Sequence, residues 1–592
     1  MIVPMKEVTL LVYEDEKEEA LSALRQWGLL HIKEREIPSG PGLLSLKEEQ
    51  KIVEEALGII KSLSLPSRNA PKRRKEENLS LVARRIIDLA KEKETLLSQQ
   101  KAIEKDAAWY EEWGKVSLAD VDYLKGKGIE IVLLRCRRRD LRSLEGLAYT
   151  ILKKKGGTYL VAVFSEGSFR GVAGCQKEAW PQRSLEEIRR EKHNILLRLD
   201  AISSEMNSEG ELKLQLEAYL KELKRQEEWQ RARANFSARD KIAFIQGYIP
   251  YDQQKSFSVL AQRHRWGVVI SEPEDFSAVP TLVRNPWWIR IIEPVFKFMG
   301  TVPGYKEFDI SLVFLFFLSL FFAMLVGDGG YGLVFLMASF LLQRKRKAPR
   351  EFFMLMYVFS IATIIWGAIS GTWFGYEKIA QLPFLRCLVV DRLNSFIADN
   401  QNFIMYMSFL IGAIHLSIAH LWRAVRFFPS RLSLGEVGWV GIIISVFFLA
   451  QKLVLGKALA PFVAYLFSLS LLLVAFFSRA EKNLIRSLFL TLQDLPLKII
   501  GSFSDVVSYL RLFAVGYATV VLAQSVNGMA GEFSLTNVTT SFISALILFF
   551  GHALNVLLGI MAVIVHGIRL NMLEFSSHLG MQWQGREYHP FK

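Results

Sequence analysis

The chain has 592 residues, of which 51% are hydrophobic, and its formal net charge is +14. A chain of this length holds several domains, and so much apolar side chain excludes a disordered or fibrous protein. The positive charge would suit binding to nucleic acid or to a cytoplasmic membrane surface. The position of the charged residues along the chain distinguishes these two possibilities. Cys136, Cys175 and Cys387 lie far apart in sequence. We therefore expect neither a disulfide framework nor a metal site, and a reducing compartment for the first two.

The composition changes near residue 305. Before this point the chain is charged and periodic, and after it long apolar runs alternate with short charged gaps. The first twenty residues lack the basic region and apolar core of a secretory signal. We expect 1–305 to be a cytoplasmic domain and 306–592 to be a transmembrane domain.

The N-terminal residues predict a small α/β lobe. Residues 6–12 are typical of a strand, 15–28 of a helix and 29–33 of a second strand. Further strands within 240–300 complete this proximal lobe. Its fold therefore joins two segments that are distant in sequence.

Two charged stretches, about 45–115 and 183–236, carry apolar residues at heptad spacing. Such a seam needs a partner helix, so we expect the two stretches to pair as an antiparallel coiled-coil hairpin. Between them, 118–176 predicts a distal α/β lobe with strands around a helical segment at 142–155. No finger, helix-turn-helix or RNP-like strand accompanies the basic residues, which excludes a nucleic-acid partner.

The second half predicts eight membrane-spanning helices, because each span needs about 20 apolar residues. The expected spans are 309–326, 329–343, 352–374, 402–422, 436–454, 459–478, 501–526 and 541–569. Lys and Arg concentrate in alternate gaps, at 343–351, 423–431 and 479–486. Short basic loops face the cytoplasm, so both termini are expected there and the lipid bilayer explains much of the charge.

Two glycine patterns occur in this half. The first is rejected as a dinucleotide site, and the second is assigned to helix packing. Gly327, Gly329 and Gly332 match GxGxxG, but apolar helical runs flank them where a dinucleotide site requires a strand and a βαβ unit. The spacing of Gly367, Gly371 and Gly375 favours close approach of another helix.

No catalytic motif accompanies these patterns. The chain contains no GxxxxGK[ST], GxSxG or HExxH motif. We therefore expect no nucleotide hydrolysis by this chain itself, and neither a cofactor nor a metal.

One arginine stands inside an apolar run. Arg511 lies roughly a dozen ångströms in from the start of its expected span. An arginine at this depth costs at least about 2.5–3.5 kcal/mol on insertion scales, and it stays protonated. It therefore needs a carboxylate, a water-filled cavity or an interface. The structural alternatives are snorkelling toward a headgroup or a pair with Asp505.

The last expected span carries a stripe of small and polar residues on one helical face. Its members are His552, Asn555, Gly559, Ala562, His566 and Arg569. A polar stripe in hydrocarbon predicts a hydrated half-path for an ion, with Glu574 following on the cytoplasmic side. His415 and His420, in the fourth expected span, are interpreted as packing residues.

At these residues the sequence resembles the membrane stator subunit of V-type and archaeal-type rotary ATPases, called subunit I in prokaryotes and subunit a in eukaryotes. The resemblance covers essentially the whole chain. The matching motifs are VPGYKEFD, GDGGYGLVF, SYLRLFAVGYA, HGIRLNMLEFSSHLG and the tail YHPF.

The resemblance places the family's essential arginine at Arg511, in the motif that Ser508 opens, and its second arginine at Arg569. His566 takes the preceding polar position and Glu574 the following acid. The family's acidic KFYEGxGxxF tail is here HLGMQWQGREYHPF, and several eukaryotic relatives carry a glutamate at Gly559. His552 or His566 would then feed protons into the path.

The resemblance implies a mainly α protein with this arm, two lobes and eight spans, in a bacterial or archaeal plasma membrane. It implies partners as well: a rotor ring of small subunits with a carboxylate, peripheral stalk subunits and the membrane-adaptor subunit of the central stalk. The stator would form two half-channels against the ring and couple proton or sodium movement to ATP hydrolysis or synthesis. The alternatives are an independent transporter or channel with a coiled-coil regulatory domain, and a membrane-anchored scaffold without transport.

Overall fold

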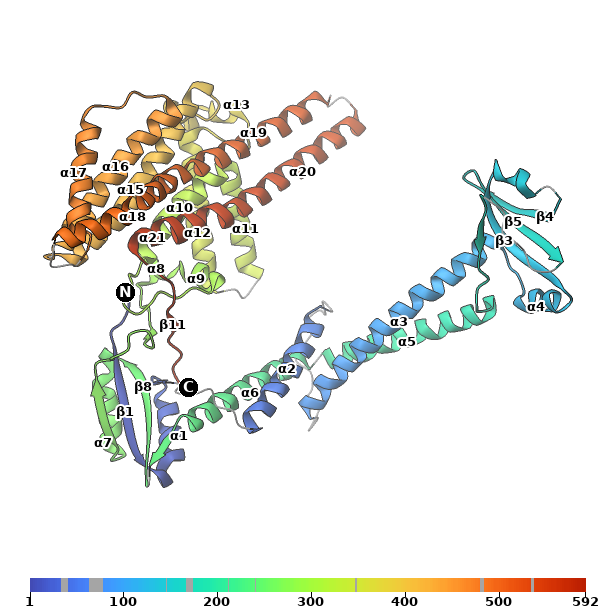
Figure 1. Cartoon of the computed structure of the whole chain (residues 1–592), viewed down its shortest axis with the longest axis horizontal. Coiled ribbons are helices and arrows are strands. Elements are labelled where there is room, and N and C mark those ends of the chain that lie inside the picture. The colour runs from blue at the N-terminus through green and yellow to red at the C-terminus, as the bar shows by residue number, and fades with distance from the viewer. Residues whose placement is uncertain are drawn as a thin grey trace. The chain divides into compact units, whose positions relative to one another are not determined.

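The computed structural model describes residues 1–33, 41–62, 78–144, 146–166, 174–210, 212–239, 241–345, 349–479, 484–533 and 537–592. It is mainly helical with small sheets (Figure 1). The chain forms two compact units, one of Met1–Lys33 with Asp240–Lys592 and one of Glu34–Arg239. The centres of two expected basic loops, 346–348 and 480–483, lie outside the described residues.

The first unit begins with the proximal α/β lobe, in which the expected strand at 6–12 and helix at 15–28 are confirmed. Its sheet has the strand order β2-β8-β1-β9, and β1 pairs antiparallel with both neighbours. Val8, Leu10 and Val12 alternate into the core, as a half-buried strand requires. The elements are β1 (Met5–Tyr13), α1 (Lys17–Trp27), β2 (His31–Ile32), β8 (Ile242–Pro250), α7 (Gln254–Arg263) and β9 (Gly267–Ser271).

The C-terminal tail returns to this lobe. β11 (Arg586–Glu587) pairs in parallel with β10 (Pro280–Thr281), and the Phe591 amide donates to the Leu30 carbonyl at 2.9 Å. Burial raises the pKa of the Tyr588 hydroxyl, which lies between these contacts, to about 12. The tail is therefore an integral part of the lobe.

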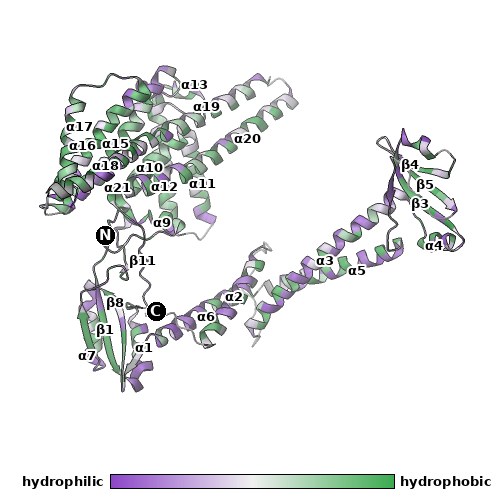
Figure 2. Ribbon diagram, viewed as in Figure 1, coloured by the Kyte–Doolittle hydropathy of each residue, from purple (hydrophilic) through white to green (hydrophobic). Residues whose placement is uncertain are grey.

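The second unit contains a helical hairpin in which α3 (Leu79–Trp113) packs on α5 (Leu185–Gly210), and α2 (Pro41–Ser62) packs on α6 (Lys213–Ala234). Ile86 and Leu89 are buried in the seam, as the heptad spacing predicts. Arg198 joins Glu92 across the hairpin at 2.8 Å. Charged residues thus flank the apolar seam, and Figure 2 shows this mixture along both arms.

The hairpin carries a distal lobe with the strand order β4-β5-β3-β6. The expected helix at 142–155 is wrong, because most of this segment forms β4. Gly156 and Gly157 both have positive φ, which fits a two-residue hairpin turn, and Tyr149 and Ile151 favour a strand. The elements are α4 (Leu118–Gly126), β3 (Ile129–Arg137), β4 (Ala148–Lys155), β5 (Thr158–Glu166) and β6 (Gln176–Glu178).

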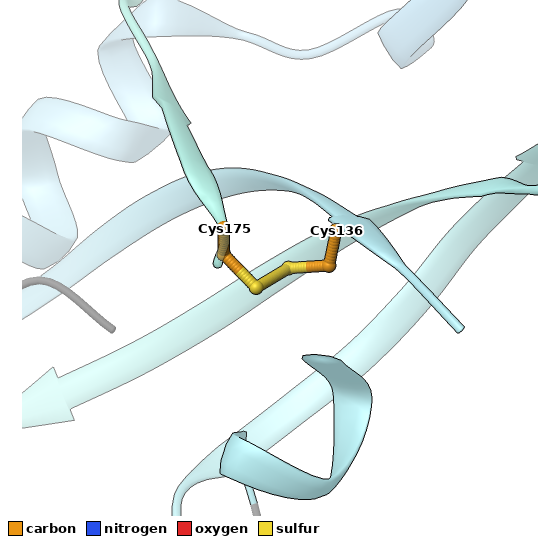
Figure 3. Close-up of a disulfide and its surroundings, with 2 residues drawn as sticks. All are labelled: Cys136 and Cys175. Carbon is orange, nitrogen blue, oxygen red and sulfur yellow. A yellow bond between two sulfur atoms is a disulfide. The ribbon is translucent and has the colours of Figure 1, made fainter. Parts of the chain in front are cut away.

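The same sheet corrects the expectation for the cysteines, since Cys136 and Cys175 form a disulfide (Figure 3). They are 39 positions apart in sequence. However, β3 and β6 are antiparallel neighbours in which Arg135 faces Gln176. The adjoining residues are therefore brought opposite each other by sheet pairing. Cys387 remains free and exposed.

The rest of the first unit is a bundle of apolar helices (Figure 2). Among the described residues, five helices are long and apolar enough to cross a membrane, or six if one bent pair counts as a span. This count replaces the eight spans that were expected, although all eight expected segments are helical. The bent pair is α10 with α11, and the segment at 459–478 forms only the 16-residue α17.

The helices of this bundle follow in chain order. They are α8 (Trp287–Arg290), α9 (Glu293–Met299), α10 (Ser311–Val326), α11 (Gly329–Lys345), α12 (Arg350–Ser370), α13 (Glu377–Ala380), α14 (Pro383–Arg386), α15 (Gln401–Phe427), α16 (Leu432–Leu455), α17 (Phe462–Phe477), α18 (Leu484–Ser508), α19 (Leu510–Glu532) and α20 (Val538–Ala562), then the π-helical η6 (Val563–Gly567) and η7 (Leu570–Phe575), and α21 (Ser576–Leu579).

The GDGGYG motif makes the 119° bend between α10 and α11. The carboxylate of Asp328 is buried and accepts hydrogen bonds from the backbone amides of Gly330, Tyr331, Phe374 and Gly375, at 2.8 to 3.3 Å. Amides freed by the break are thereby satisfied. As expected, helices and not strands flank this motif.

The glycine strip does serve close packing. A Cβ on Gly367 would lie 2.1 Å from the Gly329 nitrogen, and one on Gly375 would lie 2.4 Å from the Ala523 side chain. Both positions therefore exclude larger residues, and the backbone of the 367–375 segment can reach the bend.

We predict that Asp328→Ala destabilises the apolar bundle by several kcal/mol, since each buried donor left without an acceptor costs about 1–3 kcal/mol. Thermal unfolding of the purified chain in detergent measures the change. Asp391→Ala, at an exposed carboxylate, is the matched control. Equal melting of the Asp328 variant and the wild type would show that Asp328 does not hold the bend.

Candidate functional site

Arg511 lies near the middle of a 42-residue apolar helical run, Thr491–Glu532, which joins α18 to α19. The run is interrupted at Tyr509, so the Ser508 carbonyl is free to accept a hydrogen bond from Arg511 Nε at 2.8 Å. Arg511 is thus the second residue of α19, although the apolar run as a whole extends well beyond it in both directions. Its side chain is 22% exposed.

The partner of Arg511 is Glu574 and not Asp505. Arg511 Nη2 donates to Glu574 Oε1 at 2.5 Å, and Ser508 Oγ donates to the same oxygen at 3.3 Å. The Glu574 side chain is 5% exposed, and its Oε2 has no hydrogen-bond partner among the described residues. Neither snorkelling nor the Asp505 pair therefore describes this arginine.

The second arginine reaches the same carboxylate because the last long helix changes its winding. After α20 the chain continues as η6 and η7, which are π-helical. Residues five apart are neighbours in a π-helix. Arg569 Nε accordingly lies 3.6 Å from Glu574 Oε1 while its side chain stays 57% exposed. One buried carboxylate thus faces two guanidinium groups.

The rest of the stripe faces the interior of the bundle. Asn555, Gly559 and Ala562 are buried between their neighbours, and His552 is half-buried. His566 lies on η6, and its Nδ1 is buried without a hydrogen-bond partner among the described residues. The structure therefore brings Ser508, Arg511, Arg569 and Glu574 together, and His552 and Asn555 belong to a separate cluster.

That cluster, which we call the Tyr331 cluster, consists of Tyr331, Thr519, Asn527, His552 and Asn555. The Tyr331 hydroxyl lies 2.7 Å from His552 Nδ1 and accepts from Asn555 Nδ2 at 3.0 Å. Asn555 also donates to the Thr519 carbonyl at 2.8 Å, and His552 Nε2 lies 3.1 Å from Asn527 Oδ1. Tyr331 and Asn527 were not predicted from the sequence, although each is a polar residue within an apolar helical run.

A third group, the His578 cluster, consists of His420, Arg423, Glu436, Asp505 and His578. Contacts of 2.7 to 3.1 Å connect Glu436 to His420, His420 to His578 and His578 to Asp505. Arg423 Nη2 lies 2.9 Å from Glu436 Oε1. His420 is therefore part of a polar network and does more than pack.

His415, in contrast, is a packing residue as expected. Its ring stacks on Phe317 and Phe575, and its Nδ1 lies 2.8 Å from the Tyr509 hydroxyl. It supports the helix break at Tyr509 without joining either polar cluster.

The His578 cluster lines a cavity of about 320 Å³. Further polar and basic side chains line the same cavity, namely Arg479, Thr491, Lys498 and Ser502. A space of this size with many polar groups can hold several waters. Among the described residues, no group of three or more His, Cys, Asp or Glu side chains could hold a metal ion.

The two clusters lie on opposite sides of the Arg511–Glu574 pair. Along α18 and α19, Asp505 precedes Arg511, and Thr519 and Asn527 follow it. Along the last long helix, His578 follows Glu574, and Asn555 and His552 precede it. α19 and α20 pack side by side, so the order of the groups is the same on both helices (Figure 1). A charged pair therefore separates two polar regions of one apolar bundle.

Comparison with known proteins gives full-length relatives, although no protein-family model matches the chain. V-type ATP synthase subunit I of Borreliella burgdorferi is 29% identical, over 100% of this chain and 99% of that protein. V-type ATP synthase subunit I 1 of Treponema pallidum is 29% identical, over 100% of both chains. A-type ATP synthase subunit I of Methanocaldococcus jannaschii is 26% identical, over 75% of this chain and 69% of that protein.

One solved structure is also similar, the cytoplasmic N-terminal domain of subunit I, homolog of subunit a, of V-ATPase. It is 15% identical and matches 45% of this chain and 99% of its own length, with a TM-score of 0.22. This TM-score is too low to show that the two chains share a fold.

A double-mutant cycle of Arg511→Gln and Glu574→Gln is predicted to give a coupling energy on the order of 1–3 kcal/mol, because either single change leaves a charge unpaired in apolar surroundings. Thermal unfolding of the purified chain provides the four values. The matched cycle of Arg569→Gln with Glu574→Gln should give a smaller coupling, since Arg569 is farther away and more exposed. Independent effects of the Arg511 and Glu574 substitutions would contradict the pairing.

Proposed function

Since this chain is a homologue of subunit I of the V-type and A-type ATP synthases, and so a rotary ATPase subunit, we propose that it is the membrane stator through which protons or sodium ions pass. The observation that carries the proposal is the Arg511–Glu574 pair in the middle of an apolar helical run. An apolar bundle does not need a buried cation for stability, because replacing a buried ion pair with apolar groups is often neutral or stabilising.

Arg511 is the fixed cation of the proposed mechanism. A guanidinium remains protonated at any physiological pH, so it attracts a carboxylate on the rotor ring and lowers the pKa of that carboxyl group. The rotor carboxyl group thereby releases its proton or ion when it reaches Arg511. The same cation repels a proton or sodium ion moving directly between the two polar regions.

Glu574 can exchange Arg511 for Arg569 as its partner when Arg511 meets the rotor carboxylate. When Arg511 turns to the rotor carboxylate, the carboxylate of Glu574 would be left buried and unpaired, which is costly. Arg569 lies 3.6 Å from that carboxylate and is exposed enough to move closer. We propose that Arg569 pairs with Glu574 during this interval and that Arg511 returns once the rotor carboxyl group is reloaded.

The two polar clusters are the proposed half-channels. The His578 cluster opens into the cavity of about 320 Å³, and its Asp505 adjoins the Arg511–Glu574 pair because Ser508 Oγ donates to the Asp505 backbone carbonyl. We propose that this cavity faces the cytoplasm, and the basic residues around it support this orientation because Lys and Arg concentrate on the cytoplasmic side of membrane proteins. The Tyr331 cluster would serve the opposite side, with His552 as its titratable group.

The second unit is the proposed stator arm, with its hairpin and distal lobe. A stator must resist the torque of the rotor, and α3 alone has 35 residues and so spans about 50 Å. The edge strand β4 exposes Tyr149, Ile151 and Leu152, which supports contact with a peripheral stalk subunit. The further proposed partners of the chain are the rotor ring and the membrane-adaptor subunit of the central stalk. Both termini are proposed to be cytoplasmic.

Arg511→Ala and Arg511→Lys are predicted to abolish ion pumping coupled to ATP hydrolysis while the complex still assembles. The reason is that alanine removes the charge and lysine cannot match the two-point contact of the guanidinium. The measurement is ATP-driven acidification, or sodium uptake, by vesicles holding the reconstituted complex. Arg392→Ala, at an exposed arginine outside the bundle, is the control.

Coupled pumping by either Arg511 variant would refute the proposed role. Transport by the purified chain without a rotor would favour an independent transporter. Full activity of Arg511→Gln would favour a scaffold in which the pair is structural.

His578→Phe is predicted to reduce coupled pumping roughly tenfold or more, because it interrupts hydrogen-bonded proton transfer between Asp505 and His420. The rate of vesicle acidification at saturating ATP provides the measurement. His193→Phe, on the exposed face of α5, is the control and should pump at the wild-type rate. A wild-type rate for the His578 variant would exclude this cluster from the path.

A further inference from the structure

Two short helices, α8 and α9, precede the first apolar helix and present aromatic side chains outward. Ile291 and Ile292, between them, are buried in the core of the bundle. Trp287 and Phe298, in contrast, are 67% and 73% exposed. The segment is thus fixed to the bundle by one face and leaves large apolar rings on the other, which would suit an apolar neighbour outside the chain.

Beside the Trp287 ring lies a cavity of about 270 Å³ that two arginines line. It is lined by Trp287, Arg290, Ile291, Arg350, Glu351 and Met354. Arg290 Nη2 lies 3.4 Å from Glu351 Oε1. Arg350 makes no ion pair with any described carboxylate, so the cavity has one positive charge that the described residues do not neutralise.

The cavity adjoins the apolar surface of the bundle. Arg350 and Glu351 begin α12, one of the five helices long enough to cross a membrane. Phe352, Ile361 and Ile365 follow on that helix and are exposed. The cavity is therefore located where the polar end of a span meets its apolar outer surface. Tryptophan and arginine concentrate at this level of a bilayer.

We propose that this cavity binds the phosphate-bearing headgroup of an anionic phospholipid. Arg350 and Arg290 supply planar forks of N–H donors that match phosphate oxygens. Trp287 and Met354 contact the glycerol and the first acyl carbons, and the acyl chains lie along the exposed side of α12. A free phosphate ion would satisfy the arginines and leave the exposed rings in water, so the lipid is the better occupant.

The inference requires a membrane location for the bundle and does not depend on ion translocation. Its position at the start of α12 is remote in sequence from Arg511 and Glu574. A pumping assay on a variant, whatever its result, would therefore not show whether the cavity binds lipid. The test has to measure lipid binding itself.

The full-length chain, purified in mild detergent, is titrated with phosphatidylglycerol or phosphatidylcholine, and bound lipids are counted by native mass spectrometry. We expect preferential retention of phosphatidylglycerol by the wild type. Each change, Arg290→Gln or Arg350→Gln, should weaken that retention about fivefold, since each basic residue at a membrane surface adds a similar factor to anionic lipid binding. Trp287→Ala should weaken retention of both lipids.

The matched control is the double variant Arg386→Gln with Arg392→Gln, which removes two exposed arginines beyond the opposite end of α12 and should bind as the wild type does. Unchanged phosphatidylglycerol retention in the Arg290 and Arg350 variants, with unchanged melting temperature, would overturn the proposal. Equal retention of the two lipids by the wild type would do so as well. Displacement of the lipid by millimolar inorganic phosphate would assign the arginines to a free anion and also refute it.

Discussion

The constraint on which the structure depends is that a guanidinium in apolar surroundings needs a carboxylate. Arg511 satisfies it with Glu574, and two departures from regular helix make the contact possible. The break at Tyr509 releases a carbonyl that accepts from Arg511, and the π-helical winding of η7 carries Arg569 to the same carboxylate. Because leaving one partner unpaired costs several kcal/mol, irregular backbone is tolerated here. The irregular backbone thus lies where the charged groups meet.

The same requirement organises the other polar groups of the bundle. Asp328 accepts amides at the bend between α10 and α11, where no helix can satisfy them. Asn555 donates both to a hydroxyl and to a carbonyl. A polar group that finds a partner inside the bundle can remain there without the cost of an unpaired donor or acceptor. The clusters are therefore continuous chains of contacts and not isolated groups.

The identity of the charged residues could be predicted from sequence, and their partners could not. Arg511, Arg569 and Glu574 stand out because charges are rare in apolar runs. The choice of Glu574 over Asp505 depends on how α19 packs against the last helix, which no local spacing contains. Similarly, hydropathy finds every apolar segment but not the 119° bend that joins two of them. The disulfide was missed because Cys136 and Cys175 meet only through the pairing of β3 with β6.

The stripe on the last helix shows why a fixed helical period is insufficient here. At 3.6 residues per turn, Asn555 and Arg569 share one face. In the structure Asn555 is buried and Arg569 is mostly exposed, because the π-helical segments between Ala562 and Ser576 change the angle between successive residues. One sequence stripe thus supplies an inward polar cluster and an outward arginine. A rotor carboxylate that approaches Arg511 from outside, while Glu574 stays buried, requires the last helix to change the direction of its polar face between Ala562 and Ser576. The π-helical winding of η6 and η7 makes this change.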